Sequence, residues 1–410
     1  METLDLMLLV VVTVVLAGTN AAKFGEAQLV FDWEILELDW PSEADKLEAI
    51  RNGSYVPERN LLAGIKVYKN NVYLTIPRWT WTSGHPITLA KVVSVQGQSK
   101  LCPYPNWTAQ KQGDCHALQY VQSMEVDPNT GLMYVLDSGR VGGSLNLCPA
   151  KIVVFDLNTD TQVHSYQMPE DVVTRTHNAM NDIVLDYVAG KVRYAYISDV
   201  SEGRIHVYDF QTHSAHNLEH PSMKAEGNNG TVIHINNKDY VFGGAVDGIA
   251  ISPDFKYVYY CPLGGYSLYE VPTSVLRNPN NSGTAGPRLV GRKVSQSDGL
   301  AHGSNHLFYG ALGLNAVYFW DAEKDMADQN VGIENVKLAT QVELVRNDTT
   351  MVWPDTFAFD DQGYLWFVAN SLNTFRNPGG NPLNRVWKVF VNETGYLYEA
   401  DKRTLGTVVG

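Results

Sequence analysis

The sequence predicts an all-β protein, a six-bladed β-propeller preceded by a signal peptide. Three observations carry this prediction: a strand anchored by an aromatic residue recurs six times, the anchors lie on average about 59 residues apart, and strand-forming residues alternate with turn residues throughout. The chain has 410 residues, which exceeds the usual size of one simple core. A repeat of this length holds four short strands, and six such sheets packed around an axis bury faces that one sheet cannot cover.

The first element is a signal peptide, expected over residues 1–22. Leu6 to Ala17 is an uncharged apolar run, too short for a comfortable membrane span, and small and polar residues follow it. We therefore expect a secreted, extracellular protein without a membrane anchor, in which residues 23–410 form a single propeller.

Each blade then contributes an anchored strand, and five partner strands are recognisable. The anchors are Tyr73, Tyr134, Tyr196, Tyr259, Phe308 and Trp366, and the partner strands cover 151–156, 204–209, 267–270, 316–321 and 385–390. The Ala27 to Leu36 run is expected to pair with the C-terminal blade and close the ring. One helix is expected, over Ser42 to Arg51.

The innermost strand of each blade should begin about ten to fourteen residues before the anchor. In four blades this start carries a carboxylate that a propeller would bring toward one axis, at Asp182, Asp247, Asp298 and Asp355. Glycines follow two of these acids and would let the backbone approach closely where the channel narrows. Because like charges in a small space repel one another, the ring predicts a cation.

Three interpretations of the ring remain open. A divalent metal such as Ca²⁺ could be held by carboxylate and amide oxygens and polarise a carbonyl group, as in a metal-dependent, lactonase-like hydrolase. An organic amine could place its ammonium on Asp or Asn and its aromatic body on nearby rings. Alternatively, the acids cap turns and accept backbone N–H groups between blades, without any ligand.

Charge and motifs exclude several other classes of function. The net charge is −13 and no basic stretch occurs, which argues against a nucleic-acid partner. The sequence contains no G-x-S-x-G elbow, no H-E-x-x-H motif and no glycine-rich phosphate loop. Its histidines are scattered, and each is interpreted as structural.

Secretion affects how the cysteines and asparagines are interpreted. Four cysteines, at positions 102, 115, 148 and 261, permit up to two disulfides with three pairings open, and no C-x-x-C pair favours a thiolate zinc site. Six N-x-S/T sequons are candidate glycosylation sites. They start at Asn52, Asn106, Asn229, Asn280, Asn347 and Asn392.

Several stretches resemble the Yellow and major royal jelly protein family. They include Thr75-Ile76-Pro77-Arg78-Trp79, Gly84-His85-Pro86-Ile87, Pro103-Tyr104-Pro105-Asn106-Trp107, Tyr134-Val135-Leu136-Asp137-Ser138-Gly139 and Cys148-Pro149-Ala150-Lys151. The resemblance extends over roughly residues 55 to 395 and implies a secreted six-bladed propeller. Its members include dopachrome-converting enzymes of melanin formation, binders of biogenic amines, and nutritive or structural proteins, so the family alone does not choose a chemistry.

The resemblance also implies where a ligand would lie. Polar residues that line the channel of amine-binding relatives match Asp355 or Thr356 and Asn370, and an aromatic stacking position matches Leu372. We therefore expect a small cationic or catechol-like ligand, such as a biogenic amine. Its expected binding residues are Asp182, Asp247, Asp298, Asp355, Thr356 and Asn370. The enzyme alternative is dopachrome tautomerisation, in which Asp247 or Asp298 removes a carbon-bound proton.

Overall fold

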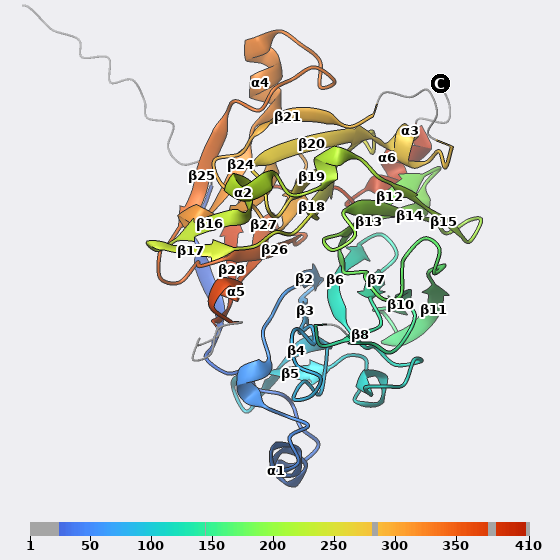
Figure 1. Ribbon diagram of the computed structural model, residues 1–410, viewed down its shortest axis with the longest axis vertical. Helices are drawn as coiled ribbons and strands as arrows, with labels where there is room; N and C mark the ends of the chain where they lie inside the picture. Colours follow the sequence, from blue (N-terminus) through green and yellow to red (C-terminus); the bar gives the residue numbers. More distant parts are fainter. Residues whose placement is uncertain (1–23, 144, 281–285, 376–382, 407–410) are drawn as a thin grey trace, which may run out of the picture.

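Six four-stranded antiparallel sheets surround one axis in the computed structural model, which confirms the six-bladed β-propeller (Figure 1). The structure describes residues 24–143, 145–280, 286–375 and 383–406, so the expected signal peptide lies outside the described residues.

The strands of each sheet are given from the axis outward. The first sheet contains β2 (Ile65–Tyr68), β3 (Asn71–Thr75), β4 (Leu89–Val95) and β5 (Gln98–Pro103). The second contains β6 (Val121–Asp127), β7 (Leu132–Asp137), β10 (Lys151–Asp156) and β11 (Thr161–Gln167), and the third contains β12 (Met180–Val188), β13 (Lys191–Asp199), β14 (Arg204–Asp209) and β15 (Ser214–Leu218). The other three are β18 (Val246–Ile251), β19 (Tyr257–Pro262), β20 (Ser267–Pro272) and β21 (Arg288–Arg292); β22 (Leu300–His302), β23 (Leu307–Ala311), β24 (Ala316–Trp320) and β25 (Gln341–Arg346); and β26 (Pro354–Phe359), β27 (Tyr364–Ala369), β28 (Asn384–Phe390) and β1 (Gln28–Trp33).

The aromatic anchors lie on the second strand of every sheet and are buried between blades. They are Tyr73, Tyr134, Tyr196, Tyr259, Phe308 and Trp366. The innermost strands β2, β6, β12, β18, β22 and β26 each contact the next, and β26 contacts β2, so the ring is complete. The recurring aromatic residue is therefore a packing device between neighbouring sheets.

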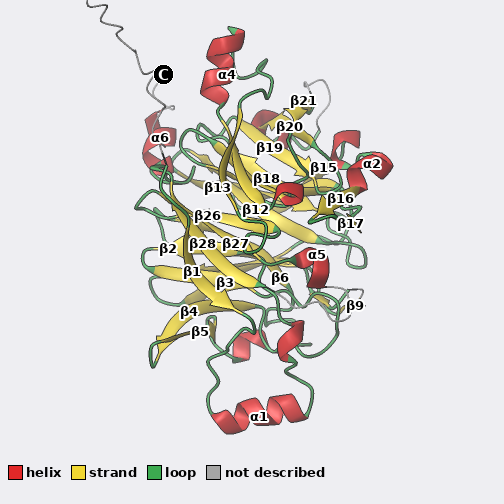
Figure 2. Ribbon diagram, turned by 90° about the vertical axis from the view of Figure 1, so that its left-hand side faces the viewer, coloured by secondary structure: helices red, strands yellow, loops and turns green. Residues whose placement is uncertain are grey.

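The last blade is completed by the first strand of the chain, as predicted. β1 pairs antiparallel with β28, with Trp33 opposite Asn384, and an ion pair of 3.0 Å joins Arg385 to Asp32 (Figure 2). The first and the last strand of the described chain are thus held in one sheet.

The predicted helix is α1 (Glu43–Arg51), which begins after Ser42, whose hydroxyl accepts the Asp45 N–H. The structure contains further helices that the sequence analysis missed, the longest being α4 (Ala322–Gln329), a largely polar helix without a strong apolar stripe. The others are α2 (Gly227–Thr231), α3 (Thr273–Leu276), α5 (Leu372–Phe375) and α6 (Ala400–Gly406). Two small hairpins, β8 (Arg140–Val141) with β9 (Leu145–Asn146) and β16 (Val232–Ile235) with β17 (Lys238–Val241), extend from the blades.

Candidate ligand-binding site

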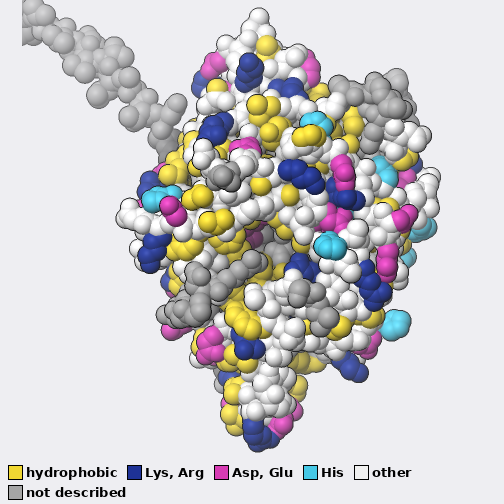
Figure 3. Space-filling model, in the orientation of Figure 1, with side chains coloured by type: hydrophobic (Ala, Val, Ile, Leu, Met, Phe, Trp, Pro, Cys, Tyr) yellow, Lys and Arg dark blue, Asp and Glu magenta, His cyan; other side chains and the backbone are white. Residues whose placement is uncertain are grey.

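The axis of the propeller opens on one face in a hollow of about 340 Å³, which we call the mouth hollow. Figure 3 shows this face hollowed beside the β16–β17 hairpin. The acids Asp247 and Asp298 line the hollow together with aromatic side chains from three loops. Those aromatic residues are Trp79, Tyr120 and Phe242. An acidic surface is thus enclosed by apolar rings, an arrangement suited to a ligand with a charged end and an aromatic body.

Asp247 and Asp298 form a hydrogen-bonded pair of carboxyl groups. Burial, followed by the negative charge of Asp298, raises the pKa of Asp247 well above its usual range. Burial also raises the pKa of Asp298, to about 6, although the Trp353 indole N–H, which donates to Asp298 Oδ2 at 2.7 Å, opposes this rise. Because both carboxyl groups are buried and repel each other, ionisation of both at once is disfavoured.

Asn181 completes this part of the hollow, because its amide donates to Asp247 Oδ1. Close backbone packing brings the two acids together. A Cβ atom on Gly248 would lie 2.2 Å from the carbonyl oxygen of Asp298, and one on Gly299 would lie 2.2 Å from that of Asp355. The interpretation of these glycines as points of close approach is confirmed.

Three of the predicted ligand residues, Asp355, Thr356 and Asn370, lie behind the wall of the mouth hollow. Thr356 Oγ1 and Asn370 Nδ2 donate to the Asp355 carboxylate at 2.9 and 2.6 Å. Asn370 also donates to the carbonyl of Leu62 at 2.8 Å and accepts the N–H of Leu372 at 3.1 Å. Leu372 does line the hollow, so this network positions the wall. Burial, then the charge of Asp298, raises the pKa of Asp355 well above its usual range.

Asp182 faces a second, smaller cavity of about 50 Å³ on the other side of the ring. It accepts the hydroxyl of Ser123 at 2.8 Å, and Lys66 lies in the same cavity, paired with Glu125 at 3.2 Å. Burial raises the pKa of Asp182 to about 6, against the pull of Lys66. Neighbouring side chains on a strand point to opposite faces, which sends Asn181 to the mouth hollow and Asp182 to this second cavity.

The C-terminal segment Gly395–Tyr398 covers the second cavity. Its Tyr396 is buried, accepts the N–H of Leu185 at 2.9 Å, and donates to Glu125 at 3.2 Å. Figure 2 shows α6, which follows this segment, on the opposite side of the molecule from α5 and β16–β17. The four acids expected in one ring are therefore divided: Asp247 and Asp298 line the open hollow, Asp355 lies behind its wall and Asp182 faces the covered cavity.

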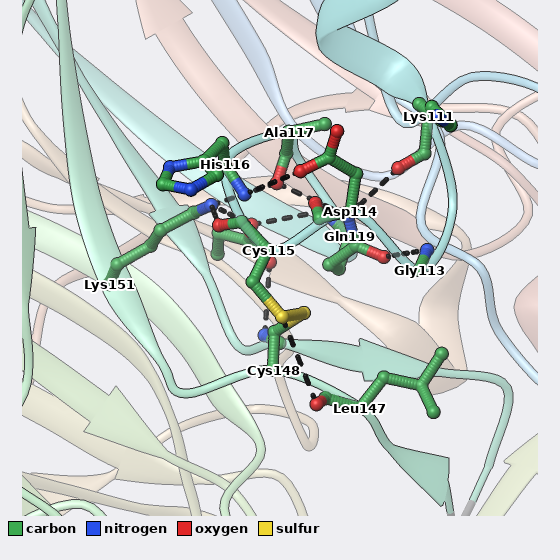
Figure 4. Close-up of a disulfide and its surroundings, with 12 residues drawn as sticks. Lys111, Gly113, Asp114, Cys115, His116, Ala117, Gln119, Leu147, Cys148 and Lys151 are labelled. Carbon is green, nitrogen blue, oxygen red and sulfur yellow. Dashed lines mark hydrogen bonds and ion pairs between the residues drawn. A yellow bond between two sulfur atoms is a disulfide. The ribbon is translucent and has the colours of Figure 1, made fainter.

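A disulfide supports one wall of the mouth hollow. Cys115 is bonded to Cys148, whereas Cys102 and Cys261 are free (Figure 4). Lys151 Nζ donates to the carbonyls of Cys115 and Ala117 at 2.6 and 2.8 Å. Gln119 Nε2 donates to backbone carbonyls of the same loop, which leads directly into Tyr120.

All six sequon asparagines are exposed, so burial excludes none of them as a glycan site. Within the described part of the chain, no helix is long and apolar enough to cross a membrane.

The sequence analysis missed the aromatic walls, because these residues lie on loops and outside the repeated strand pattern. Trp79 follows β3, Tyr120 precedes β6 and Phe242 follows β17. Trp79 ends one of the stretches that carry the family resemblance, and this was the one signal that could have drawn attention to it.

Comparison with known proteins gives a consistent result for most of the chain. The family model described as "Major royal jelly protein" matches residues 120–390. The chain is 26% identical to Protein yellow of Drosophila yakuba and of Drosophila melanogaster over 396 residues, which cover 90% of this chain and 68% of each relative. For Protein yellow of Drosophila subobscura, the identity is again 26% and 65% of the relative is covered.

Similar solved structures include a luciferin-regenerating enzyme, with a TM-score of 0.47 and 11% identity over 84% of this chain and 94% of that one. Another is the aldose sugar dehydrogenase of Streptomyces coelicolor, with a TM-score of 0.44 and 11% identity over 89% of this chain and 98% of that one. At these scores, neither says anything about the function of this chain.

Proposed function

Because the chain belongs to the major royal jelly protein family, we propose that it is a secreted Yellow-type propeller that binds a small organic cation or catechol-like molecule in its mouth hollow. Secretion is supported by the relationship to Protein yellow and by the Cys115–Cys148 disulfide, since disulfides persist mainly outside the cytosol.

The proposal rests on the Asp247–Asp298 pair. Two buried carboxyl groups that disfavour double ionisation match one ammonium group better than a divalent ion. Trp79 and Phe242 supply ring surface for an aromatic body, whereas the guanidinium of Arg140, which also lines the hollow, already lies 5.0 Å from the ring centroid of Tyr120. Ca²⁺, with two charges and a demand for six to eight oxygen ligands, would favour both carboxyl groups in the ionised form, which burial opposes.

Titration calorimetry with dopamine and serotonin, compared with uncharged analogues in which a hydroxyl replaces the amine, tests this proposal. We expect the amines to bind and Asp298→Asn to weaken them at least 30-fold, because loss of one partner of a buried charge pair costs about 2–5 kcal/mol. Asp182→Asn is the matched control, since this acid faces the covered cavity, and it should leave the affinity unchanged. Equal binding of amines and uncharged analogues would contradict the proposal.

Dopachrome conversion is a second candidate function, favoured by the same pair. Two adjacent carboxyl groups with raised pKa values, about 6 for Asp298, are suited to acid and base roles near neutral pH. In this reaction Asp298 would take the carbon-bound proton and Asp247 would donate to the developing oxyanion. Loss of dopachrome absorbance in proportion to protein, abolished by Asp298→Asn, would establish the enzyme. Binding without turnover would indicate that the protein is a ligand carrier and not an enzyme. Lactone hydrolysis that a chelator abolishes would indicate the metal-dependent alternative.

A further inference from the structure

A second cluster of potential ligands lies outside the channel, at the turn between β13 and β14. Asp199, Glu202 and His206 each bring one potential ligand atom to within 4.8 Å of the others. The side chains of Asp199 and His206 are fully buried and that of Glu202 is 4% exposed. Val200 and Ser201, between the first two of these residues, line the mouth hollow. The cluster therefore lies directly behind the rim of the proposed ligand site.

The hydrogen bonds of His206 leave one ring nitrogen with a lone pair aimed at an acceptor. Its Nδ1 lies 2.6 Å from Asn217 Oδ1, and the Asn217 amide nitrogen donates to the carbonyl of Val172 at 2.8 Å, which fixes the orientation of the amide. Nδ1 must therefore carry a proton. In the neutral imidazole, Nε2 then presents its lone pair to Asp199 Oδ2, 3.2 Å away.

The Asp199 carboxylate is itself already supplied with donors. Oδ2 accepts the N–H of Ala179 at 3.0 Å, and Oδ1 accepts those of Ser201 and Glu202 at 2.9 and 2.7 Å. Two acceptors thus face each other at 3.2 Å, and a cation is needed between them. That cation is either a second proton on His206 or a metal ion.

Glu202 provides an independent observation. Its Oε1 accepts both the N–H and the hydroxyl of Thr174, but its buried Oε2 has no hydrogen-bond partner. Arg204 Nε forms an ion pair of 3.4 Å with Oε2 without a hydrogen bond, and the same guanidinium also pairs with Glu219. Lys224 reaches only the backbone carbonyl of Glu202. The Arg204 guanidinium therefore balances part of the charge of Glu202, but Oε2 still has no hydrogen bond, and a directly coordinated ion would use its free lone pair.

We propose that Asp199, Glu202 and His206 bind a divalent transition-metal ion of the zinc class. A nitrogen ligand beside two carboxylates suits zinc, whereas calcium takes oxygen ligands. In a tetrahedral site with bonds of about 2.0 Å, neighbouring ligand atoms lie about 3.3 Å apart, close to the 3.2 Å between His206 Nε2 and Asp199 Oδ2. The Asn217 oxygen on Nδ1 is the outer contact that orients a metal-binding imidazole.

The ion would have a structural role. Its three ligands come from both strands and the turn between them, so it would fix the segment that carries Val200 and Ser201 at the rim of the hollow. The inference stands independently of the amine proposal, because no residue of the Asp247–Asp298 pair takes part.

The test uses the full-length secreted protein without a histidine tag, stripped with chelator and then titrated with zinc. We expect about one zinc per chain by mass spectrometry of the metal content, a rise in melting temperature with zinc, and a visible absorption band when cobalt replaces zinc. Glu202→Gln should weaken zinc binding at least ten-fold, since it replaces an anionic ligand by a neutral amide. It should leave the fold of the metal-free protein intact, because Oε2 has no hydrogen bond to lose and Arg204 keeps its ion pair with Glu219.

His206→Gln should also abolish zinc binding, and Glu202→Gln keeps the test valid if that variant does not fold. The control is His234→Gln, at an exposed His–Asp pair where His234 lies 2.8 Å from Asp239; it should leave the zinc content unchanged. Absence of zinc in the wild-type protein after refolding with the metal would overturn the proposal and assign the second proton to His206. Unchanged zinc affinity in Glu202→Gln would overturn it as well.

Discussion

The affinity for an amine should fall steeply when the pH is lowered through 6. The pKa of Asp298 is raised to about 6, whereas an ordinary aspartate titrates near 3.8. At this pKa, about 97% of Asp298 is ionised at pH 7.5 and about 9% at pH 5. An alkylammonium stays charged over this range, so the dissociation constant should rise about ten-fold between pH 7.5 and pH 5.

Titration calorimetry at half-unit pH steps provides the assay, with Asp182→Asn as control. Asp182 has a similarly raised pKa but faces the covered cavity, so this variant should keep the wild-type profile. An aspartate with an ordinary pKa would remain about 94% ionised at pH 5 and give a flat profile. A flat profile in the wild-type protein, or an unchanged one in Asp298→Asn, would refute the assignment of the ammonium to this carboxylate.

The same pKa shift has a consequence for stability. The folded protein binds the proton of Asp298 more tightly than the unfolded chain, so its stability from this group is present below pH 3.8 and is lost as the pH rises through about 6. Asp298→Asn removes that loss while its side-chain oxygen can still accept from Trp353. The variant should therefore melt at a higher temperature at pH 7.5 even though it no longer binds the amine. A higher melting temperature together with lost amine binding distinguishes loss of the binding site from unfolding of the protein.

Two further substitutions test the architecture around the channel. Tyr396→Phe should lower the free energy of unfolding by about 2–4 kcal/mol in urea, because it leaves a buried backbone N–H and Glu125 without their hydroxyl partner. An unchanged unfolding midpoint would mean that this hydroxyl contributes nothing to the closure of the second cavity. Gly248→Ala should cost at least about 2 kcal/mol, since its Cβ would lie 2.2 Å from a carbonyl oxygen of the next blade. Gly286→Ala, with no atom within 4 Å of the added Cβ, should unfold like the wild type, and equal stability of the two variants would argue against close packing at the axis.

The sequence predicted the structure best where every blade has the same packing requirement. Six blades need six aromatic anchors between sheets, so Tyr73 and its counterparts could be placed, as could the acids at the starts of inner strands. Which side of the ring each acid faces was not predicted. Asp182 and Asp298 look equivalent in the alignment of repeats, yet they line different cavities. Counted from the residues paired with the anchors, Asn181 occupies the position of Asp298, and Asp182 lies one residue further along, where its side chain points to the other face.

Loop residues followed no period and were missed. Phe242 reaches the mouth hollow from the hairpin β16–β17, and Tyr396 closes the second cavity from beyond the last blade strand. His206 was interpreted as structural because its partners, Asp199 and Asn217, become neighbours only when three strands pair. Neither the position nor the role of such residues can be derived from spacing along the chain.

Closure of the ring by β1 and β28 determines when the binding site comes into existence. During synthesis β1 leaves the ribosome before the other strands, but it can pair only after β28 has been made, and almost the whole length of the chain separates the two. Until these two strands meet, blades can form, but the mouth hollow has no complete wall. A nascent or truncated chain would therefore expose its carboxylates to solvent. Ligand binding would then report that the ring of six blades is closed.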